Sequence, residues 1–279
     1  MSSAWYPWFI RVIFKKTSVI RGEIILAFEF LKVGSENGVI MITLARPPLN
    51  VLTIPMMEEI VEAFKWAKDE PGSIVILDAE GKAFSAGVDV ADHTPDKVDS
   101  MIDVFDRLFL AMDAVEKPIV CLVNGAALGG GCEVVLFCDI VVASENAKLG
   151  QPEIQVGVFP PVACFLLPKL CSWPRAMDLL LSGDVIGAEQ AEKFGIVNKV
   201  LPADNFKESA MEYLKKFTAL SPVVLAMTKK AARAGLGKGF AEGIKDIDSV
   251  YLKELMVTAD AQEGLKAFME KRRPVWQGK

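Results

Sequence analysis

Two glutamates stand where their side chains are best suited to chemistry. Glu133 comes two positions after the glycine run Gly129–Gly131. Glu153 ends the segment Gly150–Glu153. Both lie in largely apolar sequence, where an ionised carboxylate is costly to bury unless it is paired or hydrogen-bonded. Because two carboxylates around one small pocket can divide acid and base work, we interpret the pair as an acid–base centre rather than as structural ion pairs.

Two small-residue segments can bring backbone N–H groups to a ligand. Three glycines at the start of a predicted helix allow close approach, and the first N–H groups of a helix are unpaired at its positive end. Such groups can form an oxyanion hole, although a tight turn packed in the core would use the same residues. The second segment, Lys82–Asp89, follows a predicted buried strand and by itself fits an ordinary surface loop better than a ligand-binding one. The glycine turn is not a phosphate-binding P-loop, because no Lys-Ser or Lys-Thr pair follows it.

Composition narrows the class of protein. With 279 residues, 52% of them hydrophobic, and a mean hydropathy of +0.32, the chain can bury a full core. The net charge of −5 gives no electrostatic reason to expect nucleic-acid binding. His93 is the single histidine, and neither a Cys/His cluster nor a G-x-S-x-G motif is present. We therefore expect no metal site, no serine-hydrolase triad and no cofactor.

The cysteines and the N-terminal residues bear on where in the cell the protein is expected. Five cysteines without a C-x-x-C pair suit reduced thiols in a cytoplasmic protein. Residues 1–27 are aromatic and basic and lack the order of a signal peptide, so we expect an extension outside the core. A surface arm, an upstream start codon and a weak peripheral membrane anchor remain alternatives for it. Polar residues and glycines interrupt the apolar run 119–143, which predicts strand, turn, helix and strand rather than a membrane span.

Periodicity predicts alternating strands and helices followed by a helical tail. The expected strands are 38–44, 74–78, 119–123, 140–143 and a short one near 148. The expected helices are 55–68, 98–115, one beginning near 130, 188–194, and further helices near 205–220, 222–234 and 259–271. Residues 80–95 are expected to form a loop. This order indicates an α/β protein with a C-terminal helical region.

Four segments together resemble one family. They are Lys82–Asp89, Asn124–Glu133, Cys138–Ile140 and Gly150–Glu153, and they resemble the enoyl-CoA hydratase/isomerase (crotonase) superfamily from about Phe28 to the C-terminus. The resemblance implies a crotonase-like spiral of ββα units over 28–202 and a helical oligomerisation region over 203–279. It further implies an acyl-CoA substrate, a homotrimer or a dimer of trimers, and no nucleic-acid or membrane partner.

The resemblance also implies roles for individual residues. The N–H groups of Val88 and Gly130 would hold the thioester oxygen, and Glu133 with Glu153 would be the two carboxylates of the hydratase branches. The remaining substrate and CoA contacts would come from Lys82, Ala83, Ala86, Asp89, Val90, Gly129, Pro152, Phe159 and Lys271. For the basic end of the chain, a solvated helix end is the alternative to a phosphate contact.

Two segments depart from straight-chain hydratases. Where those have a glycine-rich stretch, this chain has the bulkier Gly157–Cys164. This stretch and the segment around His93 resemble the branch that hydrates cyclohexa-1,5-diene-1-carbonyl-CoA in anaerobic benzoyl-CoA degradation. The alternatives are a hydratase of linear 2-enoyl-CoA and a crotonase-fold module that binds RNA or protein. His93 would either shape the mouth of the acyl pocket or lie at the surface.

Overall fold

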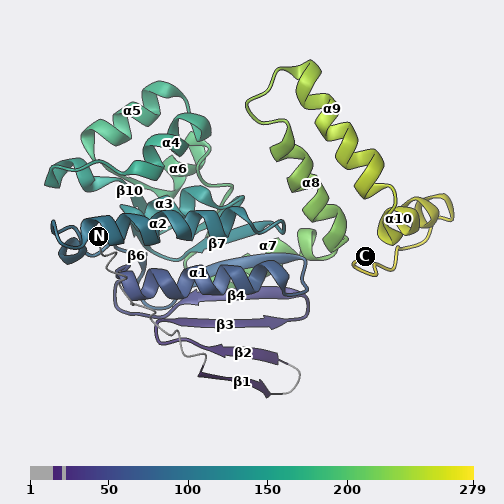
Figure 1. Cartoon of the computed structure of the whole chain (residues 1–279), viewed down its shortest axis with the longest axis horizontal. Helices are drawn as coiled ribbons and strands as arrows, with labels where there is room; N and C mark the ends of the chain where they lie inside the picture. Colours follow the sequence, from purple (N-terminus) through teal and green to yellow (C-terminus); the bar gives the residue numbers. More distant parts are fainter. Residues whose placement is uncertain (1–14, 21–22) are drawn as a thin grey trace, which may run out of the picture.

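The computed structural model describes residues 15–20 and 23–279. The larger of the two sheets that it contains has eight strands (Figure 1). Its strands lie in the order β1 (Lys15–Ile20), β2 (Glu23–Ala27), β3 (Leu31–Glu36), β4 (Val39–Leu44), β5 (Ile74–Ala79), β7 (Ile119–Val123), β9 (Ile140–Ser144) and β12 (Lys199–Leu201). Neighbours are antiparallel from β1 to β4 and parallel from β4 to β12. The parallel strands are covered on both faces, which explains why all five residues of β7 are buried.

A second sheet has four short strands. They lie in the order β11 (Val185–Gly187), β10 (Lys148–Gly150), β8 (Ala126–Leu128) and β6 (Ala83–Ser85). Each of β5, β7 and β9 in the large sheet is followed by a strand of the small sheet and then by a helix. These helices are α2 (Val98–Asp113), α3 (Gly130–Phe137) and, after the 3-10 helix η2 (Pro152–Val156), α4 (Pro161–Leu170). This succession confirms the predicted spiral of ββα units.

The predicted loop over 80–95 is wrong in part. It contains β6 and the 3-10 helix η1 (Val90–Asp92), each of three residues. Such short elements carry no measurable hydrophobic period, so the sequence pattern could not indicate them.

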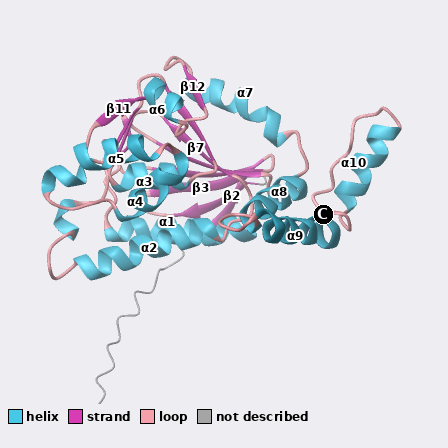
Figure 2. Ribbon diagram, turned by 90° about the horizontal axis from the view of Figure 1, so that it is seen from above, coloured by secondary structure: helices cyan, strands magenta, loops and turns pink. Residues whose placement is uncertain are grey.

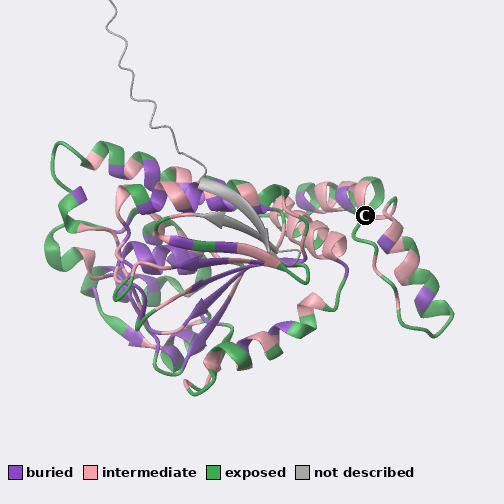
Figure 3. Cartoon of the chain, turned by 90° about the horizontal axis from the view of Figure 1, so that it is seen from below, coloured by how far each residue is buried: buried purple, intermediate pink, exposed green. Residues whose placement is uncertain are grey.

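Helices cover both faces of the large sheet (Figure 2). On one face α1 (Ile54–Asp69) packs beside α2, and buried residues follow the inner sides of both helices (Figure 3). On the other face α7 (Phe206–Thr218) places Ala210 and Leu214 in a second apolar cluster with Ile74 and Val120. The helices α5 (Trp173–Ser182) and α6 (Ala188–Phe194) complete the core. The sheet therefore sits between two apolar layers that fix where its strands end.

Of the four α-helices that follow β12, α7 packs on the sheet, and the other three extend away from α4 and α5 (Figure 1). They are α8 (Pro222–Ala234), α9 (Phe240–Val250) and α10 (Ala259–Met269), with a π-helical turn, η3 (Tyr251–Leu255), before α10. The Lys229 ammonium of α8 lies 2.6 Å from Oδ2 of Asp139 and donates to the Lys117 carbonyl. Arg233 donates to the Asp113 carbonyl at 2.9 Å. These contacts attach the predicted helical tail to the core.

The domain boundaries that we predicted from the sequence stay predictions. Strands β1 and β2 belong to the predicted extension 1–27 and continue the large sheet beyond β3, while residues 1–14 and 21–22 lie outside the described residues. The predicted boundary at 202/203 falls between β12 and α7. Among the described residues, no helix has both the length and the apolar character needed to cross a membrane.

The contact between α3 and β6 requires a glycine at position 131. A Cβ added to Gly131 would lie 2.6 Å from the Ser85 Cβ and 2.8 Å from the Ser85 carbonyl oxygen. We expect Gly131→Ala to lower the free energy of unfolding by about 1–3 kcal/mol, measured by urea denaturation, despite alanine's higher helix propensity. Gly239→Ala, where nothing lies within 4 Å of the added carbon, is the matched control. Equal effects of the two substitutions would contradict this packing.

Candidate active site

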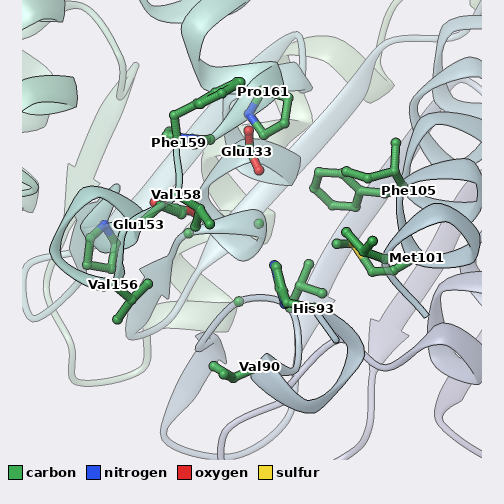
Figure 4. Close-up of a pocket in the computed structure, with 18 of the residues that line it drawn as sticks. Val90, His93, Met101, Phe105, Glu133, Glu153, Val156, Val158, Phe159 and Pro161 are labelled. Carbon is green, nitrogen blue, oxygen red and sulfur yellow. The ribbon is translucent and has the colours of Figure 1, made fainter. Parts of the chain in front are cut away.

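The predicted site residues surround one cavity of about 590 Å³ between α2, α3, η1 and the segment 152–161 (Figure 4). The residues that the sequence singled out and that line it are Ala86, Val88, Val90, His93, Gly129, Gly130, Glu133, Pro152, Glu153 and Phe159. They come from elements far apart in the chain, and the two sheets and the first turn of α3 bring them together.

Four of the predicted contacts lie outside the lining of this cavity. Lys82 is exposed before β6, and Ala83 is buried within that strand. Asp89 caps η1, where its carboxylate accepts from the Ala91 N–H at 3.0 Å. Lys271 follows α10, which Figure 1 places away from α3 and α4. Binding roles for these four residues stay predictions.

Glu133 occupies the first turn of α3 and is 2% exposed. Its Oε1 accepts two hydrogen bonds, from the N–H groups of Val162 at 2.7 Å and Ala163 at 2.8 Å. Both donors belong to the first turn of α4, whose free N–H groups favour a carboxylate. Burial nevertheless raises the pKa of Glu133 to about 7, with a further upward contribution from the charge of Glu153 and a downward one from the two N–H groups. This carboxyl group therefore changes protonation state near neutral pH.

Glu153 lies on η2 and is half-buried. Burial raises its pKa, while its own backbone N–H and the charge of His93 act in the opposite direction. The amide of the buried Gln151, with its nitrogen turned toward Glu153, donates to both carboxylate oxygens at 3.2 and 3.3 Å. His93 lines the mouth of the cavity, and its Nδ1 lies 3.0 Å from the Asp89 carbonyl oxygen. His93 is also exposed at the C-terminal end of η1, so its position fits both alternatives, and its role stays a prediction.

Val88 and Gly130 come together because Gly130 has no side chain. A Cβ added to Gly130 would lie 2.6 Å from Cγ2 of Val88. The Gly130 N–H is at the first position of α3, where a helix provides no acceptor. The Val88 N–H lies between two residues whose backbone groups bond Leu52: Gly87 through its carbonyl and Asp89 through its N–H. Two backbone donors at the edge of the cavity suit the binding of a developing oxyanion.

Gly129 precedes the helix in a conformation that favours glycine. Its φ is 52°, and an added Cβ would lie 2.6 Å from Oε1 of Glu153. Its N–H donates to the Gly150 carbonyl at 3.0 Å, which joins the end of β8 to the end of β10. The glycine turn therefore holds Glu153 close to the start of the helix that carries Glu133.

Sequence reasoning missed one wall of the cavity. Four residues of α2 at helical spacing form it: Val98, Met101, Ile102 and Phe105. Their period predicted a helix that packs on the core, and nothing in the period distinguishes a core face from a cavity wall. The opposite wall includes Val156, Val158 and Phe159, and Figure 4 shows Glu133 between the two walls. The described residues contain no group of three or more His, Cys, Asp or Glu side chains that could hold a metal ion.

The enoyl-CoA hydratase/isomerase family model matches residues 34–279. The chain belongs to this family. A probable mitochondrial enoyl-CoA hydratase of Dictyostelium discoideum is 37% identical over 247 residues, which cover 86% of this chain and 87% of that protein. A cyclohexa-1,5-dienecarbonyl-CoA hydratase of Thauera aromatica is 34% identical over 246 residues, which cover 88% and 95%. The solved enoyl-CoA hydratase of Mycobacterium smegmatis has a TM-score of 0.84 at 28% identity, with 89% of this chain and 99% of that chain covered.

Membership of the enoyl-CoA hydratase/isomerase family confirms the predicted class of protein. The chain is an enzyme, a hydro-lyase of the enoyl-CoA hydratase type, and an acyl-CoA is its substrate class. The crotonase-like fold predicted from the motifs is also confirmed. The alternative of a binding module without enzymatic activity is therefore not supported.

The raised pKa of Glu133 couples its ionisation to stability. Between the ordinary value of 4.5 and about 7 the folded protein keeps a proton that the unfolded chain releases, so the free energy of unfolding falls as the pH rises through this range. We expect Glu133→Gln, whose amide oxygen can still accept from α4, to be more stable than the wild type at pH 8 by up to about 3 kcal/mol. The advantage should shrink toward pH 5 in urea denaturation. Glu212→Gln, at an exposed site on α7, is the control, and a pH-independent effect at Glu133 would contradict this interpretation.

Proposed function

We propose that this enoyl-CoA hydratase adds water to a cyclic dienoyl-CoA, converting cyclohexa-1,5-diene-1-carbonyl-CoA to 6-hydroxycyclohex-1-ene-1-carbonyl-CoA in anaerobic benzoyl-CoA degradation. The observation that carries the proposal is the apolar lining of the cavity that contains the two glutamates. Apolar side chains enclose it from α2 on one side and from Val156–Pro161 on the other. A flat, apolar ring fits between two such walls.

The similar proteins include one named for a cyclic substrate and others named for enoyl-CoA in general. The Thauera aromatica protein acts, by its name, on the cyclic diene, whereas the Dictyostelium discoideum protein is named for enoyl-CoA in general. The bulky stretch Gly157–Cys164 favours the cyclic diene as substrate, because a glycine-rich stretch at this place would leave the cavity wall more open.

In the proposed reaction the Val88 and Gly130 N–H groups bind the thioester oxygen and polarise the conjugated system. Water between Glu133 and Glu153 attacks the β-carbon and gives a proton to one carboxylate. The electron pair of the attacked double bond moves into the thioester and along the ring. The other carboxyl group then supplies a proton to the remote ring carbon, which restores an enoyl-CoA. The low polarity of the two walls strengthens each of these electrostatic interactions.

We further propose a cytoplasmic homotrimer or dimer of trimers that uses no cofactor beyond the CoA of its substrate. Exposed apolar side chains on the C-terminal helices support assembly. Phe240 is 84% exposed, and Phe268 is 85% exposed. Large apolar residues gathered on one region commonly mark an interface.

Removal of either carboxylate should stop hydration while leaving the pocket intact. We expect Glu133→Gln and Glu153→Gln each to lower kcat by about 10²–10⁴-fold, the usual contribution of a positioned acid or base. Binding of a saturated acyl-CoA, measured by calorimetry, should change little. The exposed Glu212→Gln substitution serves as the control for expression and folding. Near-wild-type kcat in either active-site variant would refute the two-carboxylate mechanism.

A comparison of two substrates tests the proposal that the natural acyl group is a ring. We expect the wild type to hydrate the cyclic dienoyl-CoA with a kcat/KM at least about tenfold above that for crotonyl-CoA, because the walls fit the ring more closely. Phe159→Ala should reduce this preference, and because Phe159 is 67% exposed the substitution should not unfold the protein. Steady-state kinetics with both thioesters measures the effect. A preference for crotonyl-CoA would establish the linear alternative.

A further inference from the structure

We infer that Phe105 is a specificity-determining residue that closes the inner end of the acyl pocket and limits the length of a straight acyl chain. The inference rests on the proposed use of the cavity as the acyl site. It does not depend on whether the natural acyl group is a ring.

Phe105 lies next to the place where the thioester would bind. It lines the cavity from the inner face of α2 and is only 2% exposed. A Cβ added to Gly130 would be 3.3 Å from Cζ and 3.4 Å from Cε2 of its ring. The edge of the Phe105 ring therefore covers the same glycine whose N–H is proposed to hold the thioester oxygen. An acyl group bound there would begin beside this ring, so the ring would limit how far the group can extend inward.

Two further aromatic rings support Phe105 from behind. Its ring meets that of Phe109 edge to face, with centroids 4.9 Å apart. Phe109 in turn lies 5.2 Å from the ring of Phe137 at the end of α3. Both Phe105 and Phe109 are buried, so the phenyl group cannot swing aside without displacing its neighbours. Close packing makes Phe105 a fixed stop rather than a movable side chain.

The opposite wall differs in this respect. Val156 is 72% exposed and Phe159 is 67% exposed, so neither has packed neighbours on its outer side. In Figure 4 both lie on the opposite side of the cavity from Phe105 and Met101. A longer chain can displace the exposed wall, but it meets resistance at Phe105. The buried ring is consequently the place where a single substitution should alter chain-length selectivity.

The test measures kcat/KM for a series of linear trans-2-enoyl-CoA substrates from four to ten carbons. With Phe105→Ala, we expect the ratio for eight carbons over four carbons to rise at least about tenfold, because each methylene that gains an apolar place contributes roughly a factor of four. Phe105→Leu should give a smaller rise in the same direction and is the variant to rely on if the alanine variant does not fold. Phe217→Leu on α7, where the ring packs with Tyr213 on the far face of the sheet, is the control.

An unchanged chain-length profile in folded Phe105→Ala or Phe105→Leu protein would overturn the inference. A rise in the Phe217→Leu control equal to that at Phe105 would do the same, since general loosening would then explain it. These outcomes are independent of the proposed cyclic substrate. If the wild type prefers crotonyl-CoA to the cyclic diene, the proposed substrate is wrong. A change in the chain-length profile of the Phe105 variants would still support Phe105 as the residue that limits chain length.

Discussion

The hydrogen bonds between the buried carboxylate of Glu133 and the first turn of α4 are the contact on which the site depends. They join the helix that carries the carboxylate to the helix that directly follows the exposed wall. Without these donors an ionised group with 2% exposure would lose its solvation and gain little in return. With them, the group stays buried and titrates near pH 7. One interaction thus positions a buried carboxyl group, lowers its pKa against the effect of burial and holds the start of α4 at the cavity.

Close backbone approach is the second requirement, and the two sheets provide it. The strands β8 and β10 end together, which brings Gly129 to Glu153, and β6 lies close enough to α3 to leave no room for a side chain at Gly131. Backbone donors held in this way are already oriented before a substrate binds, which is the condition for strong stabilisation of developing charge. The ββα spiral places successive helix and strand ends in one region, so the cavity follows from the order of the elements.

The sequence predicted the chemistry better than the boundaries of the site. Glu133 and Glu153 could be singled out because carboxylates in apolar sequence are unusual and each of them lies beside a glycine-containing turn. The long helix α2 follows a strong hydrophobic period, and the buried strands β5 and β7 are marked by continuous apolar runs. The short strands β6 and β8 do not, since three residues cannot define a period.

Long-range placement explains what else the sequence missed. The α2 wall was predicted as core, because whether an apolar helix face meets other side chains or a cavity depends on the tertiary structure. Lys82, Asp89 and Lys271 were proposed from motif position and lie outside the lining of the cavity, so their binding roles stay predictions. The attachment of α8 through Lys229 and Asp139, 90 positions apart in the chain, left no local pattern to read.

The unequal burial of the two walls has a consequence for how such an enzyme can diverge. Most surface replacements change stability by no more than about 0.5 kcal/mol, whereas replacements in a packed core commonly cost several times that amount. Val156 and Phe159 belong to the first kind, and Phe105 and Met101 to the second. New acyl preferences can therefore arise by drift at the outer wall without compensating changes elsewhere. Changes at the inner wall lower the free energy of unfolding and are tolerated only where that free energy is large enough. Homologues should therefore vary more at the outer positions than at the inner ones.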